Sequence, residues 1–117
     1  MNLIIDIGNT YVKFAVFQDN ILKNKTVVTL DAFEQTFNSI IASFPKLKRC
    51  IISSVGKTEQ QHIHLVQTTI DTITLNPDLK LPFKNRYKTP KTLGVDRIAL
   101  VCASVRQFPH KNVLIID

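Results

Sequence analysis

Three short stretches of the 117-residue chain place carboxylates next to small polar or basic residues. The first is Asp6-Ile7-Gly8-Asn9-Thr10, where an acid ends an apolar run and a tight turn follows. Such a turn presents a carboxylate, a hydroxyl and backbone N–H groups at one place, which suits a nucleotide phosphate and its Mg²⁺, held by the acid through water. Lys13 follows closely, and its long side chain can lean back towards the same phosphates. Ordinary hairpin turns also favour Asn and Gly, so that alternative stays open.

The second stretch, Gly94-Val95-Asp96-Arg97, places an acid and a base in the first turn of an expected helix. Helix N-termini stabilise carboxylates, so Asp96 is a candidate to orient or deprotonate the nucleophile of a phosphoryl transfer. Arg97 offers a planar fork for an anionic or polar substrate group. Routine helix capping produces the same pattern, and the residues alone do not separate the two.

The third stretch is the apolar run 113–116 that stops on Asp117, a layout that repeats Ile4-Ile5-Asp6. Two strands that each carry such an acid are typical of a duplicated, two-lobed phosphate-binding fold. A strand-end acid facing solvent is the simpler alternative. Because an unpaired apolar strand rarely ends a domain, we expect this run to open a second lobe of a longer protein.

The elements that must position these stretches follow from hydrophobic periodicity and breaker residues. We expect three antiparallel strands, then helices alternating with strands, and a long connection at 76–93. Asp31 and Glu34 form a capping-box pattern for the first helix, Thr58 caps the second, and Gly94 and Pro109 bound the third. The predicted strands lie at 3–7, 11–17, 26–30, 49–55, 72–75 and 112–117.

The predicted fold class is therefore α/β, a mixed sheet in β-β-β-α-β-α-β order with helices on its faces. That arrangement resembles ribonuclease-H-like lobes of actin-like ATPases. We expect residues 1–111 to form the N-terminal ribonuclease-H-like lobe and residues 112–117 to form the first strand of a truncated second lobe.

Composition indicates one compact domain, with 44% hydrophobic and 21% charged residues and only three glycines. No apolar run approaches the roughly 20 residues needed to span a bilayer. The net charge of +6 favours anionic partners, although a solvated basic surface explains it equally well. Cys50 and Cys102 lack metal-ligand spacing and are expected to be reduced thiols in a cytosolic protein.

Taken together, the stretches at 6–13, 92–97 and 114–117 resemble the type III pantothenate kinases of the acetate and sugar kinase/actin-like superfamily. The resemblance runs from residue 3 to residue 117, the front half of such an enzyme. It implies ATP-dependent phosphorylation of pantothenate to 4′-phosphopantothenate, the first step of coenzyme A biosynthesis. It also implies a cytoplasmic enzyme that is a homodimer when full length.

Residue by residue, the resemblance implies that Asp96 accepts the proton of the pantothenate hydroxyl and that Asp117 holds a monovalent cation, K⁺ or NH₄⁺. Asp6 lies near Mg²⁺ in this scheme. The family's second phosphate loop, a Gly-Thr pair soon after the acid at 117, is absent, so we expect the 117-residue chain to be inactive by itself. The implied ATP-binding residues are Asp6, Ile7, Gly8, Asn9, Thr10, Tyr11, Val12 and Lys13, and the implied pantothenate-binding residues are Tyr87, Gly94, Val95, Asp96 and Arg97.

Two other functions fit part of the pattern. Another sugar kinase or phosphatase of the actin-like superfamily would share the first stretch, but Gly94-Val95-Asp96-Arg97 argues against it. A basic nucleic-acid-binding module would need several aromatics among its charges, and only Tyr87 lies in such a run. We therefore expect a small-molecule substrate, with neither nucleic acid nor membrane as a partner.

Overall fold

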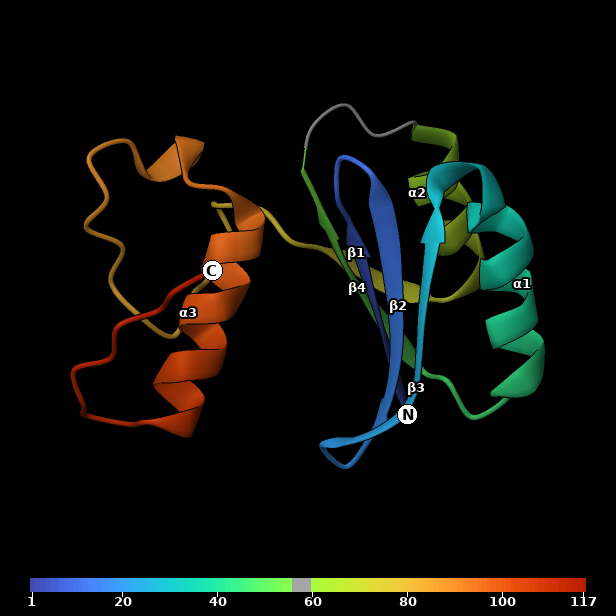
Figure 1. Cartoon of the computed structure of the whole chain (residues 1–117), viewed down its shortest axis with the longest axis horizontal. Helices are drawn as coiled ribbons and strands as arrows, with labels where there is room; N and C mark the ends of the chain where they lie inside the picture. Colours follow the sequence, from blue (N-terminus) through green and yellow to red (C-terminus); the bar gives the residue numbers. More distant parts are fainter. Residues whose placement is uncertain (56–59) are drawn as a thin grey trace. The chain divides into compact units, whose positions relative to one another are not determined.

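The structure is a computed structural model that describes residues 1–55 and 60–117. The chain forms two compact units, Met1–Leu75 and Asn76–Asp117 (Figure 1). This division falls at the start of the predicted long connection rather than after residue 111. That residues 112–117 open a second lobe stays a prediction.

The first unit is built on a five-stranded sheet with the order β3-β2-β1-β4-β5. β1 pairs antiparallel with β2, and β2 pairs antiparallel with β3, whereas β1–β4 and β4–β5 pair parallel. The predicted meander and mixed sheet are therefore confirmed. The strands are β1 (Asn2–Ile7), β2 (Tyr11–Gln18), β3 (Ile21–Thr29), β4 (Arg49–Ser54) and β5 (Asp71–Thr74).

One face of this sheet is covered by α1 (Phe33–Ser43) and α2 (Gln60–Thr69), which lie on the same side in Figure 1. Every second side chain of β1 and β2 points into this layer, the pattern expected of strands with one buried face. An aromatic cluster fills the centre, with the rings of Phe14 and Phe33 5.3 Å apart between centroids. The buried core comprises Leu3, Ile5, Ile7, Val12, Phe14, Val16, Phe33, Phe37, Ile40, Cys50, Ile52 and Val66.

The predicted capping box of the first helix is wrong. The chain enters α1 through a 3₁₀ turn, η1 (Leu30–Ala32), so Asp31 lies inside that turn and makes no cap. The Thr29 hydroxyl donates a hydrogen bond to the Asp31 carboxylate, which holds that carboxylate away from the start of α1. Thr58, the predicted cap of the second helix, lies outside the described residues.

The second unit contains the predicted long connection, a 3₁₀ turn η2 (Pro90–Thr92) and α3 (Val95–Gln107). Gly94 is the N-cap of α3, and the helix stops before Pro109, as predicted. Within α3, Ile98 is fully buried, while Val105 is 36% exposed. No helix in the described parts of the chain has both the length and the apolar character required to cross a membrane.

The predicted strand at 112–117 does not form within the described residues. Its apolar side chains Leu114 and Ile116 are 84% and 89% exposed. A strand needs a neighbour for its backbone N–H and C=O groups, and none of the described residues pairs with this run. The apolar pattern of residues 112–117 therefore predicted a strand, but no described strand pairs with these residues.

The two cysteines are free, as expected, but their surroundings differ. Cys50 on β4 is 2% exposed, and burial raises the pKa of its thiol to about 12. Cys102 on α3 is half-buried, and burial raises its pKa while a backbone hydrogen bond lowers it in part. Both thiols are thus neutral at physiological pH, which argues against a nucleophilic role for either.

Truncation of Phe33 tests the aromatic cluster. Phe33→Ala should lower the free energy of unfolding by about 3–5 kcal/mol, because a fully buried ring is replaced by a cavity. Urea unfolding followed by circular dichroism measures this change. Ile21→Ala is the control, since Ile21 is 59% exposed and should matter by about 0.5 kcal/mol or less. Equal effects of the two substitutions would contradict the packing described above.

The raised pKa of Cys50 predicts a pH dependence of stability. The thiol ionises near pH 9.0 in the unfolded chain and near pH 12 in the folded one, so between these values the unfolded chain binds fewer protons. The free energy of unfolding therefore falls as pH rises through this window, by about 1.4 kcal/mol per pH unit from this group. In Cys50→Ala the fall should be shallower by about that amount when both proteins are unfolded with urea between pH 10 and 11. Parallel pH profiles would refute the prediction.

Candidate functional site

The predicted phosphate-binding pair lies on the hairpin formed by β1 and β2. Asp6 and Lys13 are directly opposite each other in the register, with Lys13 Nζ 3.6 Å from Asp6 Oδ2. Their neighbours Ile5, Ile7 and Val12 point into the core, so this pair projects from the sheet face opposite the helices. The structure thus brings together a carboxylate suited to hydrated Mg²⁺ and a cation suited to phosphate oxygens.

In the turn between these strands, not every backbone N–H group is free to bind a ligand. The Gly8 N–H donates to the Tyr11 carbonyl at 2.9 Å, so this amide closes the turn and does not face a ligand. A Cβ on Gly8 would lie 3.2 Å from the same carbonyl oxygen, which explains the glycine by close approach. Asn9 and Thr10 are exposed at the tip and are the residues able to face an anion.

Three other predicted ATP-binding residues divide between the two faces of the sheet. The Ile7 and Val12 side chains are buried, at 2% and 0% exposure, and point away from Asp6 and Lys13. Any contact from these two residues must come from their main chain. Tyr11 is 54% exposed and lies on the same face as Lys13.

The structure adds one residue that the sequence analysis missed as part of this site. Ser53 is the register partner of Asp6 across the parallel β1–β4 pair, so both side chains leave the same face of the sheet. Ser53 is only 9% exposed. The signal in the sequence is a pair of serines, Ser53 and Ser54, at the carboxyl end of an apolar strand. Ligands in α/β sheets commonly bind at this end of parallel strands.

In the second unit, the start of α3 holds the Asp96 carboxylate in a defined position. Asp96 Oδ1 accepts a hydrogen bond from the Arg97 backbone N–H at 2.9 Å. A Cβ on Gly94 would lie 2.5 Å from this same oxygen. Gly94 has a φ of −56°, which any residue can adopt, so space for the carboxylate explains the glycine. Gly94, Asp96 and Arg97 therefore form one local arrangement, in which the carboxylate folds back over the helix start.

A cavity of about 280 Å³ in the second unit collects several of the remaining predicted residues. Tyr87, Arg97 and Asp117 share its wall, although they are distant in sequence. Tyr87 is placed by a turn in which its N–H donates to Asn85 Oδ1 at 3.0 Å. Polar groups at an otherwise apolar wall suit a small amphipathic ligand. The residues around the cavity are Tyr87, Leu93, Arg97, Leu100, Val101, Ile115 and Asp117.

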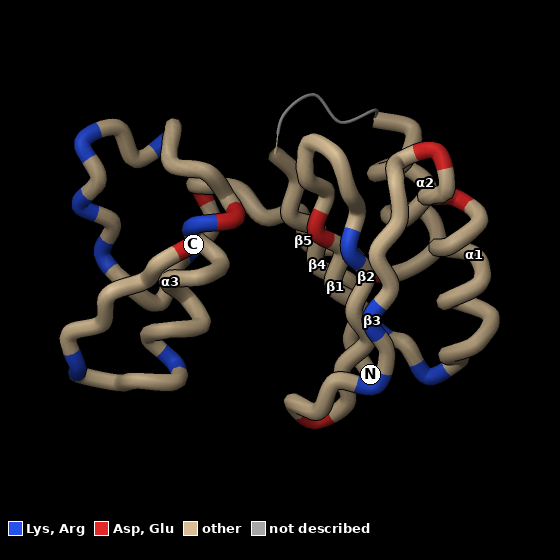
Figure 2. The backbone as a smooth tube through the Cα atoms, viewed as in Figure 1, with Lys and Arg blue, Asp and Glu red and all other residues tan. Residues whose placement is uncertain are grey.

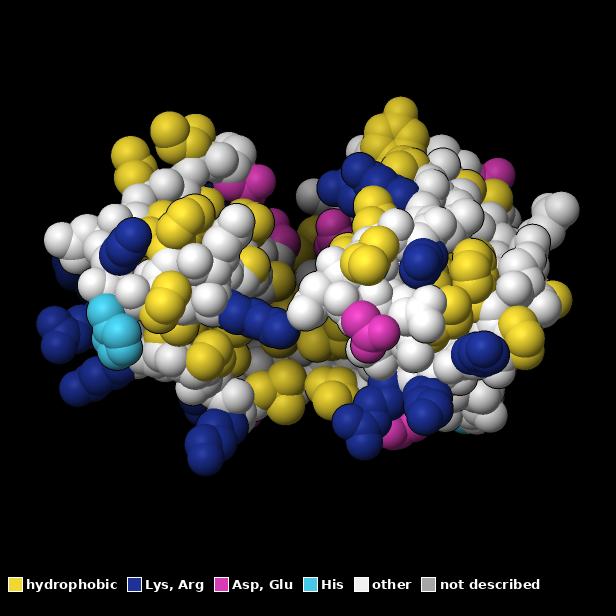
Figure 3. Space-filling model, turned by 90° about the horizontal axis from the view of Figure 1, so that it is seen from below, with side chains coloured by type: hydrophobic (Ala, Val, Ile, Leu, Met, Phe, Trp, Pro, Cys, Tyr) yellow, Lys and Arg dark blue, Asp and Glu magenta, His cyan; other side chains and the backbone are white. Residues whose placement is uncertain are grey.

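The basic charge of the chain is concentrated in this second unit. Residues 76–117 carry eight Lys and Arg against three Asp, whereas residues 1–75 are nearly balanced, with seven against six. Figure 2 shows basic residues along the connection that leads into α3. On the face seen in Figure 3, basic side chains project singly or in small groups and form no continuous surface. This distribution favours small anions over a long polyanion.

Two metal ions are implied by the family resemblance, Mg²⁺ at Asp6 and a monovalent cation at Asp117, and the surrounding residues suit only the first. No group of three or more His, Cys, Asp or Glu side chains within residues 1–55 and 60–117 is arranged to hold a metal. Mg²⁺ usually keeps several waters and needs only one or two carboxylates beside substrate phosphates, so Asp6 fits it. Asp117 shares its cavity with the Arg97 guanidinium and no second carboxylate, an arrangement that does not fit a cation held by this unit alone.

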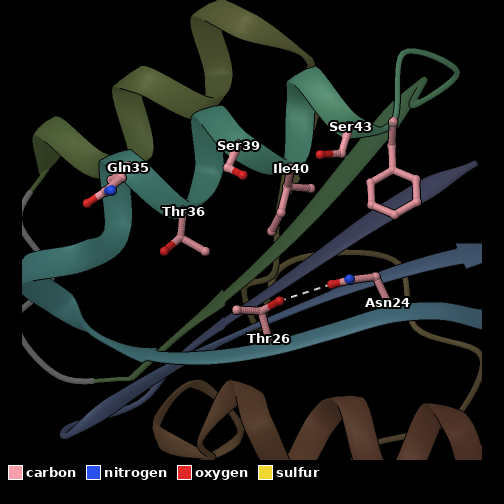
Figure 4. A pocket seen from close by; sticks show the side chains of 8 residues that line it. Asn24, Thr26, Gln35, Thr36, Ser39, Ile40 and Ser43 are labelled. Atoms are coloured by element: carbon pink, nitrogen blue, oxygen red, sulfur yellow. Dashed lines mark hydrogen bonds between the residues drawn. The ribbon is translucent and has the colours of Figure 1, made fainter.

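A separate cavity of about 500 Å³ lies between β3 and α1 (Figure 4). Its polar side chains are all uncharged, and Thr26 Oγ1 donates to Asn24 Oδ1 at 3.0 Å within it. None of the predicted site residues lines this cavity. Without a cation for phosphate or a carboxylate for proton transfer, it does not provide the predicted chemistry. The lining residues are Asn24, Thr26, Gln35, Thr36, Ser39, Ile40, Ser43 and Phe44.

Comparison with known proteins gives a consistent result along the whole chain. The sequence profile of a family described as "Type III pantothenate kinase" matches residues 2–117. Relatives named type III pantothenate kinase occur in Christiangramia forsetii, at 45% identity, Flavobacterium psychrophilum, at 37%, and Flavobacterium johnsoniae, at 34%. Each match covers 100% of this chain and 48% of the relative. The chain therefore spans about half the length of the curated relatives it matches.

Proposed function

The chain belongs to the type III pantothenate kinase family, and from this premise we propose that its full-length protein phosphorylates pantothenate with ATP. The product is 4′-phosphopantothenate, and the reaction opens coenzyme A biosynthesis. The observation that carries this proposal is the Asp96 carboxylate, held at 2.9 Å by the Arg97 amide in the space that Gly94 leaves free. Such a positioned carboxylate is what a phosphoryl-transfer enzyme needs beside its nucleophile.

On the donor side, Lys13 and the exposed turn residues Asn9 and Thr10 bind the phosphates of ATP. Lys13 neutralises charge on the phosphate oxygens, while Asp6 lies 3.6 Å from it on the same sheet face. Asp6 would hold a bound Mg²⁺, and such an ion would supply positive charge to the transferring phosphoryl group. Tyr11 lies on this face as well and extends the binding surface beyond the turn.

On the acceptor side, Arg97 and Tyr87 bind pantothenate at the cavity that they share. The hydroxyl oxygen of pantothenate attacks the γ-phosphorus, and the bond between that phosphorus and the oxygen bridging to the β-phosphate breaks. The hydroxyl proton passes to the Asp96 carboxylate, and ADP leaves with the bridging oxygen. Val95 and Gly94 contribute the helix start that keeps this carboxylate in place.

Several parts of the proposal rest on family membership and not on the geometry. Asp117 as the ligand of a K⁺ or NH₄⁺ ion is one of them, and no step is derived from it. The homodimer and the cytoplasmic location are further predictions. Among alternatives, another actin-like kinase or phosphatase is the nearest, and a nucleic-acid module is disfavoured because Tyr87 is the lone aromatic of the basic connection at 84–91.

Asp96→Asn in the full-length protein should lower kcat for pantothenate phosphorylation by about 10²- to 10⁴-fold, because the amide cannot accept the proton. ADP release measured with a coupled assay gives kcat, and circular dichroism checks that the fold is intact. Asp78→Asn removes an exposed acid from the same unit and should leave kcat unchanged. Parental turnover by the Asp96 variant would remove this residue from the mechanism.

Gly94→Ala tests the positioning of the carboxylate without changing it chemically. The added methyl would lie 2.5 Å from Asp96 Oδ1, so the carboxylate must move. We expect kcat to fall by roughly tenfold or more, since displacement of a catalytic group by about 1 Å commonly costs that much or more. Gly94 is the N-cap of α3, where alanine is less favourable than glycine, so we expect a small fall in melting temperature and kcat is compared at a temperature where both proteins are folded. If kcat stays at the parental value, the space at Gly94 has no catalytic importance.

A further inference from the structure

A polar row crosses three strands of the sheet on the face away from α1 and α2. Lys13 on β2 and Ser53 on β4 both stand directly opposite Asp6 on the central strand β1. Neighbouring strands lie about 4.8 Å apart, so register partners on one face have adjacent side chains. The row therefore places a hydroxyl on one side of Asp6 and an ammonium group on the other.

Ser53 is the unusual member of this row. It is 9% exposed, and no other polar residue of the described chain is classed as buried. Its hydroxyl oxygen has no hydrogen-bond partner among the described residues, and none of them, Asp6 included, satisfies it. A buried hydroxyl without a partner destabilises a folded protein, because it loses its hydrogen bonds to water and gains none.

An alanine at position 53 would avoid the destabilisation that a buried, unsatisfied hydroxyl causes. The three residues of β4 before Ser53, from Cys50 to Ile52, are apolar, and Cys50 and Ile52 lie in the core on the other face of the strand. Local packing therefore does not call for a hydroxyl at residue 53. An unsatisfied polar group in a native protein is frequently one that is satisfied by a ligand.

We infer that Ser53 is a nucleotide-binding residue, whose hydroxyl donates a hydrogen bond to a phosphate oxygen of bound ATP beside Asp6. Three observations support it: the shared register with Asp6, the burial, and the missing partner. Lys13, 3.6 Å from Asp6, supplies the positive charge that keeps an anion in this place. The inference rests on the proposed function for the identity of the ligand.

Ser53→Ala in the full-length protein tests this role with two readouts, nucleotide affinity and stability, because a ligand-binding hydroxyl affects the first without supporting the second. The Kd for MgATP, measured by isothermal titration calorimetry, should rise about tenfold, the loss expected for one hydrogen bond to a charged group. Without nucleotide, the melting temperature should stay at the parental value or rise, since an unsatisfied hydroxyl is removed. Ser53→Thr retains the hydroxyl and should restore most of the affinity.

Ser54→Ala is the matched control, because Ser54 is the next residue of β4 and points to the other face of the strand. It should leave the Kd for MgATP unchanged. Parental MgATP affinity of Ser53→Ala would overturn the inference, whatever happens to the melting temperature. A weaker affinity together with a lower melting temperature would also overturn it, because the hydroxyl would then support the fold.

The result of the MgATP-binding test of Ser53 can be distinguished from the result of the test of the proposed function. A parental protein that binds MgATP but does not phosphorylate pantothenate contradicts the proposed function, while the binding experiment still decides the role of Ser53. A parental protein that phosphorylates pantothenate, with a Ser53→Ala variant of unchanged MgATP affinity, leaves the function in place and removes Ser53 from the site.

Discussion

Alternation of side chains along the strands of the sheet is the constraint on which the proposed nucleotide-binding residues of the first unit depend. β1 and β2 bury every second residue under α1 and α2, and this leaves the intervening residues on the opposite face. Asp6 and Lys13 are such residues, and the antiparallel register places them 3.6 Å apart. A shift of the register by one residue would exchange the two faces and move the carboxylate into the aromatic core. The hydrophobic core therefore also determines where the proposed phosphate-binding groups lie.

The proposed acceptor residues of the second unit depend instead on the start of helix α3. At α3, a missing side chain at Gly94 and a backbone amide at Arg97 together hold one carboxylate oxygen. The aligned peptide dipoles of the helix favour negative charge at that end. The concentration of basic residues in 76–117 adds a positive field around the same unit, which favours a small anionic ligand.

Within the first unit, Ser53 differs from the core in how it relates to stability. The Phe14–Phe33 contact and the alternating strands satisfy packing and hydrogen bonding together. Ser53 departs from this consistency, since its buried hydroxyl has no described partner. Local departures of this kind are expected at functional sites, where a ligand supplies the missing interaction. In this chain the departure occurs beside Asp6, within the row that the phosphates would contact.

Sequence patterns by themselves determined the elements and the chemical groups. Period-two apolar runs specified the meander, and Gly94 and Pro109 specified the ends of α3, because these signals are local. The same reasoning failed for the cap at Asp31, whose carboxylate the Thr29 hydroxyl holds, and for the strand at 112–117, which has no described partner. Both failures concern interactions that a local pattern does not contain.

Only the tertiary structure decided which of these groups meet. The pairing of Ser53 with Asp6 depends on the parallel register between β1 and β4, two strands separated by more than 40 residues of sequence. The cavity that joins Tyr87 to Arg97 likewise depends on how the connection folds against α3. Residue type and spacing thus indicate which chemistry a chain can perform. Long-range backbone pairing and packing decide where that chemistry is assembled, because they bring residues that are distant in the sequence next to one another.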